Sequence, residues 1–264
     1  KKEIIEFLLS NESSDSKVGV IPIVGMGGLG KTTLARMVYN DEVVKKNFDL
    51  KAWVCVSDEF DIFRISRVIL ESITNKACEF KDLNQVQVQL KQNLVGKKIL
   101  IVLDDVWDKK YYDWSVLKIP FNDVAPGSKI IVTTRDRDVA LVMGTVQNHL
   151  LQHLSDDNWW SVFEQHAFGN RSLDANPNLV FIGRKIVEKC KGLPLAARTL
   201  GGLLRFKERD DEWDIVFNSK IWYLTEQGNE IPPALRLSYY HLPSHLKQCF
   251  AYCSILQKYY EFEK

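Results

Sequence analysis

The chain has 264 residues, 45% of them hydrophobic, which is enough to bury one large core or two of ordinary size. Its 35 basic and 34 acidic residues give a formal net charge of +1. That balance argues against a nucleic-acid partner, because a surface that binds phosphates usually shows as a basic surplus. No apolar run approaches the roughly 20 residues that cross a bilayer, and no signal peptide opens the chain. We therefore expect neither a nucleic-acid partner nor a membrane segment.

Strand-like and helix-like patterns alternate over the first 150 residues. Apolar runs bounded by turn residues predict strands at 18–24, 51–56, 99–103 and 129–134. Helical spacing of apolar residues predicts helices over 1–9, 31–40, 62–73 and 86–94. Alternation of this kind is typical of a mostly parallel, three-layer α/β sheet.

From about Ser155 the strand-like runs largely stop. Helical patterns cover 156–168, 179–190, 194–206, 211–218, 231–240 and 244–256. We expect an α/β domain over 1–160, a helical domain over 161–228 and a further domain beginning at 229. An aromatic helix face is expected to pack between the first two domains, and consists of Trp159, Trp160, Phe163 and Phe168.

The five cysteines form no C-x-x-C pair, and their odd number argues against a disulfide framework. A reducing cytosolic or nuclear compartment fits this usage better. Cys249 and Cys253 are spaced to share one helix face. We expect both to be buried small hydrophobic residues rather than a thiol site.

The segment from Gly25 to Thr32, GMGGLGKT, satisfies the phosphate-loop pattern G-x-x-x-x-G-K-[ST] between a predicted strand and a predicted helix. Glycines let the backbone wrap closely, so that successive N–H groups face a polyphosphate at the positive end of the helix. The lysine supplies a full charge, and the hydroxyl of Thr32 can ligate Mg²⁺. The expected nucleotide ligands here are Gly25, Gly27, Gly28, Leu29, Gly30, Lys31, Thr32 and Thr33.

The strand predicted at 99–103 ends in two carboxylates, Asp104 and Asp105, which is the Walker B pattern. Ligands bind at the carboxyl ends of parallel strands, so both acids should lie beside the phosphate loop. Asp104 would then hold Mg²⁺, and Asp105 would orient or deprotonate an attacking water. The alternative is a strand that ends in a solvated acidic turn.

The strand predicted at 129–134 is followed by Arg135. If this strand neighbours the one that ends at Asp104, the guanidinium reaches the γ-phosphate and senses it or stabilises charge during hydrolysis. The alternative is a surface arginine paired with Asp136 or Asp138.

Six stretches in this order resemble the NB-ARC region of plant intracellular NLR immune receptors, which are STAND-type P-loop ATPases. Trp107 after the acidic pair, together with AWVCVS, is similar to the coiled-coil class. The stretches are GMGGLGKTT (25–33), FDLKAWVCVSDEFD (48–61), KKILIVLDDVW (97–107), GSKIIVTTR (127–135), CKGLPLA (190–196) and CFAYCSIL (249–256).

The resemblance implies a P-loop nucleotide-binding domain, a helical ARC1 domain and the truncated beginning of a winged-helix ARC2 domain. It implies ADP or ATP with Mg²⁺ as cofactors, ADP at rest, and oligomerisation after exchange to ATP. Gly192 and Pro194 would approach the nucleotide from ARC1, although Pro194 also fits an ordinary helix start. An incomplete ARC2 core would leave apolar side chains exposed, among Leu237, Leu242, Leu246, Phe250 and Ile255.

The resemblance also implies partners: an N-terminal coiled-coil domain, C-terminal leucine-rich repeats, and a pathogen effector or a host protein that the receptor guards. It implies a cytoplasmic location, with nuclear or membrane-peripheral pools. Two other functions stay open. One is a turnover P-loop ATPase or kinase, and the other is a winged-helix DNA-binding STAND regulator.

Overall fold

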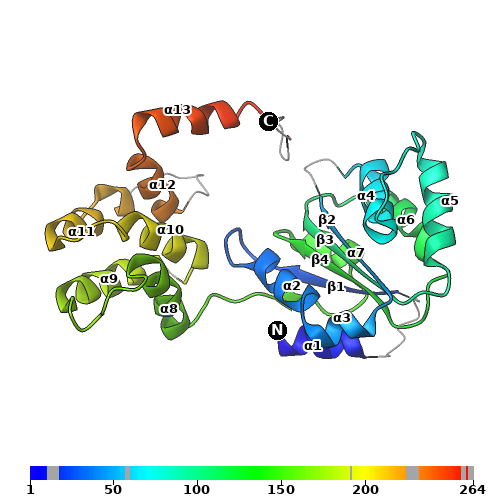
Figure 1. Ribbon diagram of the computed structural model, residues 1–264, viewed down its shortest axis with the longest axis horizontal. Helices are drawn as coiled ribbons and strands as arrows, with labels where there is room; N and C mark the ends of the chain where they lie inside the picture. Colours follow the sequence, from blue (N-terminus) through cyan, green and yellow to red (C-terminus); the bar gives the residue numbers. More distant parts are fainter. Residues whose placement is uncertain (11–17, 57–59, 191, 224–231, 257–259, 261–264) are drawn as a thin grey trace. The chain divides into compact units, whose positions relative to one another are not determined.

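Figure 1 shows the computed structural model of the chain, which describes residues 1–10, 18–56, 60–190, 192–223, 232–256 and 260. The chain divides into two compact units, residues 1–151 and 152–264. The first is built on a sheet, and the described part of the second is helical. The division keeps helix α8 (Asp156–Ala167) whole, whereas the boundary expected at residue 160 falls inside it. The second boundary, at 228/229, stays a prediction.

The five strands of the first unit form one parallel sheet in the order β2-β3-β4-β1-β5. They are β1 (Val18–Val24), β2 (Leu50–Cys55), β3 (Ile99–Val106), β4 (Ser128–Thr134) and β5 (His149–Leu150). The four predicted strands are confirmed, and β3 runs on to Val106 instead of ending at 103. Because β1 lies between β4 and β5, and β4 between β3 and β1, the segments that follow β1, β3 and β4 emerge side by side.

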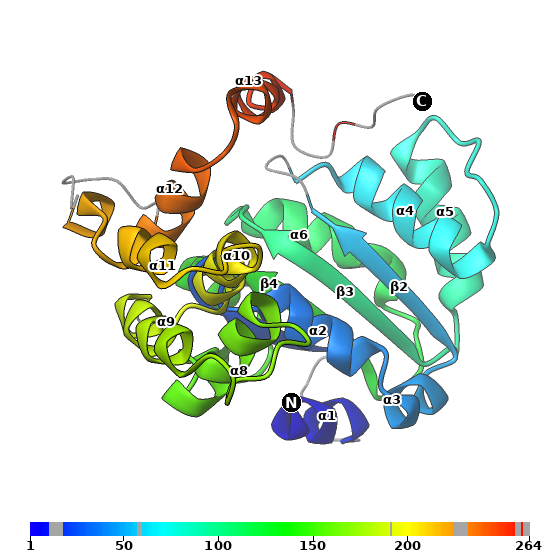
Figure 2. The same ribbon diagram turned by 60° about the vertical axis from the view of Figure 1, so that its left-hand side comes forward.

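Helices cover both faces of this sheet (Figure 2), which confirms the expected three-layer α/β architecture. On one face, Ile21, Leu100 and Ile131 pack with α1, α2 and α3. On the other, Val20 and Ile101 belong to a core with α4, α5, α6 and α7. Successive strand residues therefore enter opposite cores. These helices are α1 (Lys2–Leu9), α2 (Lys31–Tyr39), α3 (Glu42–Asn47), α4 (Ile62–Thr74), α5 (Leu83–Leu94), α6 (Tyr111–Lys118) and α7 (Arg137–Met143), with a 3₁₀ turn η1 (Ile119–Phe121) after α6.

Aspartates begin several of these helices. Asp61 accepts the Arg64 backbone N–H at 3.0 Å, and Asp82 accepts that of Gln85 at 3.1 Å. Caps of this kind satisfy amides that have no partner within the helix and contribute about 1 kcal/mol each. Among the described residues, no helix is long and apolar enough to cross a membrane.

The second unit contains helices α8 to α13. Besides α8 they are α9 (Pro177–Lys189), α10 (Pro194–Leu204), α11 (Asp210–Phe217), α12 (Pro233–Tyr240) and α13 (Ser244–Cys253), with a 3₁₀ turn η2 (Lys220–Tyr223). The aromatic face of α8 forms the core of this unit rather than a layer between two domains. Phe163 meets the Trp213 ring edge-on with centroids 6.1 Å apart, and Phe168 lies 5.3 Å from it. The expectation was wrong because all of α8 belongs to the second unit, where α11 supplies the facing tryptophan.

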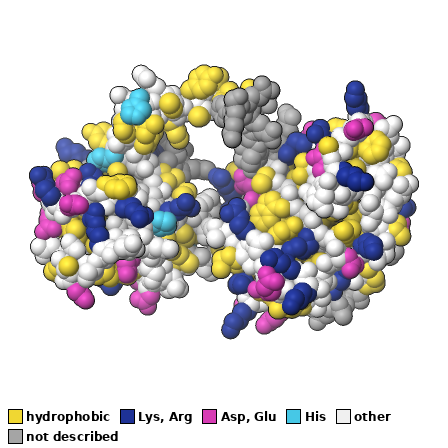
Figure 3. Space-filling model, viewed as in Figure 1, with side chains coloured by type: hydrophobic (Ala, Val, Ile, Leu, Met, Phe, Trp, Pro, Cys, Tyr) yellow, Lys and Arg dark blue, Asp and Glu magenta, His cyan; other side chains and the backbone are white. Residues whose placement is uncertain are grey.

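Helix α13 exposes most of its apolar side chains, and Figure 3 shows hydrophobic side chains on its surface. Phe250 is 63% exposed and Ile255 77%, which agrees with the exposure expected for these side chains, whereas Leu237 on α12 is buried and departs from it. Cys249 and Cys253 are also exposed, so their expected burial was wrong. Their helix face has no described neighbour that covers it. Elsewhere on the face drawn in Figure 3, basic and acidic side chains are intermingled.

Candidate functional site

The loop between β1 and α2 is hydrogen-bonded to the sheet at its first residue, Gly25, and has open space beside its last glycine, Gly30. The Gly25 N–H donates to the carbonyl of Thr134 at 3.2 Å, which ties the loop to the end of β4. Gly28 and Gly30 have φ angles of 83° and 94°, a left-handed conformation that strongly favours glycine. The buried Leu29 lies against Gly25 and holds the middle of the loop down.

The start of α2 is suited to an anion. Gly30 is its N-cap residue and provides no side-chain acceptor, so the first amides of α2 keep their capacity to donate. A methyl group added to Gly30 would meet no described atom within 4 Å. The helix therefore begins at an open space that its N–H groups and dipole make favourable for phosphate oxygens. Thr33 is exposed on this first turn.

Lys31 lies beneath the loop rather than in solvent. Its ammonium donates to the carbonyl oxygens of Gly25 at 2.7 Å and Met26 at 3.1 Å, and the residue is only 7% exposed. Burial lowers the pKa of Lys31, and the nearby Arg135 acts in the same direction, while Asp105 and Asp104 oppose them. The loop thus holds a desolvated cation that a polyphosphate would stabilise.

The predicted acidic pair lies where the Walker B pattern placed it. The Asp104 carboxylate, 5% exposed, accepts a hydrogen bond from the Thr32 hydroxyl at 2.9 Å. The same oxygen accepts the hydroxyl of Thr133 at 2.5 Å. The alternative of a solvated acidic turn does not describe Asp104, because its carboxylate is buried against the phosphate loop.

Arg135 lies over the phosphate loop. A Cβ added to Gly27 would come within 3.1 Å of the guanidinium carbon. The guanidinium stacks 4.7 Å from the centre of the Trp107 ring, and its Nε is 4.0 Å from Asp105 Oδ1. The alternative, a surface pairing with Asp136 or Asp138, is not what the structure holds: both of those acids pair with Lys109, at 2.7 and 2.9 Å.

The residues at the loop fit a magnesium ion. The Thr32 hydroxyl and the Asp104 carboxylate present the oxygen ligands that Mg²⁺ prefers. Across the described residues, no group of three or more His, Cys, Asp or Glu side chains could hold a metal on its own. Mg²⁺ usually binds one or two protein groups together with phosphates and water, and Thr32 and Asp104 are two such groups.

Gly192 and Pro194 lie in the second unit, so their expected approach to a nucleotide stays a prediction. Pro194 is the first residue of α10. Gly192 has a φ of 76°, and a Cβ there would come within 2.8 Å of the Cβ of His153. The structure thus gives Gly192 a packing role within its own unit.

Two contributors to the site escaped sequence reasoning. Thr133 was noted only as part of a strand, and Trp107 only as a mark of resemblance. The sequence did hold a signal for Thr133. It is a polar residue near the end of an apolar strand, next to the strand that carries Asp104 and Asp105. The stacking of Arg135 on Trp107 had no signal in sequence spacing, because the two residues follow different strands, β4 and β3.

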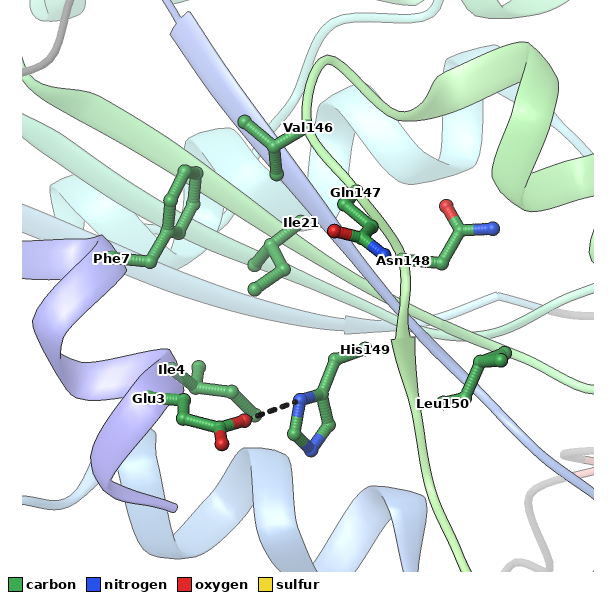
Figure 4. A pocket seen from close by; sticks show the side chains of 9 residues that line it. All are labelled: Glu3, Ile4, Phe7, Ile21, Val146, Gln147, Asn148, His149 and Leu150. Carbon is green, nitrogen blue, oxygen red and sulfur yellow. Dashed lines mark ion pairs between the residues drawn. The ribbon is translucent and has the colours of Figure 1, made fainter.

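A separate pocket of about 480 Å³ lies between α1 and the β1–β5 edge of the sheet (Figure 4). Its lining includes Phe7 and Ile21, and at one side His149 Nδ1 lies 3.4 Å from Glu3 Oε2. The described lining residues include none from the loop Gly25–Thr32. This pocket and the phosphate loop are therefore different places.

Comparison with known proteins agrees with this geometry. The NB-ARC domain family matches residues 1–173. The putative disease resistance RPP13-like protein 1 of Arabidopsis thaliana is 47% identical over 100% of this chain and 25% of its own length. Disease resistance protein RGA2 of Solanum bulbocastanum is 46% identical over 100% of this chain and 27% of its own. The chain thus spans about a quarter of the length of these relatives.

Among solved structures, a STAND signal-transduction ATPase with a tetratricopeptide-repeat sensor, from Pyrococcus horikoshii, superposes with a TM-score of 0.52. It covers 98% of this chain and 34% of its own, and the 17% identity supports a shared fold only. The family match covers well over half of this chain and includes the loop, the acidic pair and Arg135. The chain belongs to the NB-ARC family, and its relatives are plant disease-resistance proteins.

Proposed function

We propose that this chain is the nucleotide-binding switch of a plant immune receptor, and that it binds ADP or ATP together with Mg²⁺. One observation carries the proposal: the Thr32 hydroxyl of the phosphate loop donates to the Asp104 carboxylate at 2.9 Å. That contact brings the phosphate-binding element and the metal-binding acid to one point. The family match supports nucleotide binding as the common property.

In this proposal the first amides of α2 and the backbone of Gly25, Gly27, Gly28, Leu29 and Gly30 bind the phosphates. Lys31 exchanges its bonds to the loop carbonyls for bonds to β- and γ-phosphate oxygens. Thr32 and Asp104 hold Mg²⁺, which offsets the charge on the phosphates. Thr33 would add a contact from the first turn.

Arg135 and Asp105 are proposed to act at the γ-phosphate. In hydrolysis the oxygen of a water would bond to the γ-phosphorus while the bond to the bridging oxygen breaks, and that oxygen keeps the electron pair in ADP. Asp105 would orient the water and accept its proton, leaving inorganic phosphate as the second product. Arg135 would stabilise the charge and register whether a γ-phosphate is bound.

For the whole receptor we propose that ADP marks the resting state and ATP the active state. A ligand shifts a conformational equilibrium only by the difference between its affinities for the two states. Contacts from Gly192 and Pro194 to the same nucleotide would supply such a difference. The proposal includes coiled-coil and leucine-rich-repeat domains in the full-length receptor, self-association when ATP is bound, and a cytoplasmic location. It also includes recognition of an effector or a guarded host protein. Its support is that the relatives are disease-resistance proteins.

The nucleotide released on denaturing the purified chain tests the proposal. We expect close to one ADP or ATP per chain, retained through purification with Mg²⁺ present. Turnover should be well below roughly 1 per second, the lower end for kinases and working enzymes. An empty site that takes up no added nucleotide would refute the binding, and rapid turnover would refute the switch.

Asp105→Ala separates the roles of the two acids. We expect slower hydrolysis with ADP affinity kept within about threefold, because Asp105 faces Arg135 rather than Thr32. Asp104→Ala should instead remove the magnesium dependence of binding. Equal loss of hydrolysis and binding in Asp105→Ala would mean that the two assignments are exchanged.

A further inference from the structure

The pairing of β3 with β4 is interrupted at the two acids. Leu103 pairs with Val132, and the next paired residues are Val106 and Thr134. Asp104 and Asp105 on β3 therefore lie opposite the single residue Thr133 on β4. This two-against-one pairing is a β-bulge. Asp105 takes a φ of 59°, a left-handed conformation that costs a non-glycine residue about 1–2 kcal/mol.

The bulge explains how two consecutive carboxylates serve one site. In a regular strand, neighbouring side chains point to opposite faces, so one acid of the pair would be turned away. Here Asp104 contacts Thr32 at 2.9 Å, while Asp105 lies 4.0 Å from the Nε of Arg135. Both partners belong to the phosphate-loop region, so the bulge re-aims a side chain that regular pairing would misplace.

One hydroxyl fastens this bulge from the opposite strand. The Thr133 hydroxyl donates to Asp104 Oδ1 at 2.5 Å and accepts the backbone N–H of Asp105 at 2.8 Å. A hydroxyl has one hydrogen and two lone pairs, so it satisfies both bonds at once. Thr133 is 1% exposed, which leaves little room for water to replace it.

We propose that Thr133 is a positioning residue that sets the geometry of both acids, Asp104 for the metal and Asp105 for water. The proposal rests on the nucleotide-binding function proposed above. The β-branched side chain of Thr133 has few rotamers, which keeps the hydroxyl directed at the bulge. Without that hydroxyl, the Asp105 amide loses its bond to Thr133, which supports the left-handed backbone conformation of Asp105.

The test compares Thr133→Val and Thr133→Ser in the whole 264-residue chain. Valine keeps the shape and removes the hydroxyl, whereas serine keeps the hydroxyl. For Thr133→Val we expect single-turnover ATP hydrolysis to fall about 10- to 100-fold, as for other residues that orient ligands of a metal site. The gain in ADP affinity on adding Mg²⁺ should shrink roughly tenfold, with the affinity in EDTA unchanged within about threefold. Thr133→Ser should stay within about threefold of the parent in every assay.

Amide hydrogen exchange of the nucleotide-free chain gives a readout independent of activity. The Asp105 amide should exchange at least about tenfold faster in Thr133→Val than in the parent, because it has lost its bond to the Thr133 hydroxyl. Thr145→Val is the matched control: its hydroxyl also accepts a strand amide, that of Val20, at 2.7 Å, but away from the acids. Thr145→Val should speed the exchange of the Val20 amide and leave hydrolysis and the Mg²⁺ effect unchanged.

The outcomes separate the two proposals. A parent chain that binds no nucleotide refutes the proposed function, while the exchange of the Asp105 amide still reports whether Thr133 holds the bulge. A parent that binds Mg²⁺ and nucleotide, with Thr133→Val matching it in magnesium effect and Asp105 protection, refutes the role of Thr133. If Thr133→Val does not fold, Thr133→Ala, which adds no second methyl beside the carboxylate, serves the same comparison.

Discussion

Two glycine turns, one in each unit, put the same residue type to opposite uses. Gly30 and Gly192 both have positive φ angles, 94° and 76°, and both lie just before a helix. Beside Gly30 the direction of a side chain is open, with no described atom within 4 Å of an added Cβ. Beside Gly192 that direction is filled by His153, at 2.8 Å.

The helices that follow differ in the same way. Helix α2 begins with Lys31 and keeps its first N–H groups and a cation at the turn. Helix α10 begins with Pro194, which has no N–H to offer. A left-handed glycine before a helix is therefore insufficient evidence for a phosphate site. A phosphate site also needs open space beside the glycine and N–H donors after it. Of these two described turns, the one at Gly30 has both and the one at Gly192 does not.

Removing the cation from the first turn should have the largest effect. We expect Lys31→Ala to weaken ADP binding by roughly 1.5–3 kcal/mol, about 10- to 150-fold in Kd, since bonds to a charged group are worth that much. The sheet should stay folded, because Lys31 contacts loop carbonyls rather than the apolar core. Isothermal titration with ADP measures the change, and Lys46→Ala on the exposed face of α3 controls for lost charge. Full ADP occupancy in Lys31→Ala would show that the lysine has another role.

A methyl group at each glycine should separate folding from binding. Gly192→Ala should destabilise the second unit by about 2 kcal/mol or more, because strain at positive φ adds to the clash with His153. Gly30→Ala should cost only about 1–2 kcal/mol in strain, yet place its methyl where phosphate oxygens are expected. Hydrogen exchange of α10 peptides and ADP titration measure the two effects. Equal effects of both variants on stability would contradict the difference in packing.

Sequence patterns were enough for the sheet and for the loop because both rest on local rules. Buried parallel strands read as apolar runs, and the phosphate loop is a contiguous stretch with fixed spacing. The bulge at Asp104 and Asp105 was out of reach, since it exists only where Thr133 of another strand fails to pair one to one. The face of α8 read correctly as core but was assigned to the wrong place. Amphipathicity tells which side of a helix is buried and not what buries it.

The aromatic support of Arg135 should contribute a smaller effect. Trp107→Ala removes a ring 4.7 Å from the guanidinium, a stacking interaction worth about 0.5–1 kcal/mol at a partly exposed site. We expect the preference for ATP over ADP to fall about two- to fivefold, because Arg135 is proposed to contact only the γ-phosphate. Trp107→Phe keeps a ring and should retain part of the preference. Unchanged ratios of the two Kd values in Trp107→Ala would show that Arg135 is held by Asp105 alone.

The titration of Lys31 should give the smallest measurable difference between the open turn at Gly30 and the filled turn at Gly192. Burial, with Arg135 adding to it, lowers the pKa of Lys31 below its ordinary value of 10.5. Between that lowered pKa and 10.5, the unfolded chain binds more protons than the nucleotide-free folded chain. The free energy of unfolding therefore gains a rising contribution with pH in that window. Polyphosphate favours the charged ammonium, so ADP affinity should fall as pH rises through the same window.

If the free energy of unfolding rises with pH while ADP affinity falls, the titrating group is a cation that is desolvated in the free protein and stabilised by the bound phosphates. Denaturant unfolding of the nucleotide-free chain and ADP titration, both from neutral pH to pH 10.5, measure them. Lys31→Ala should flatten both contributions, while Gly192→Ala should lower stability without changing either slope. An affinity that rises with pH would mean that Lys31 is not the group that meets the phosphates, and that the open space beside Gly30 is served by backbone amides alone.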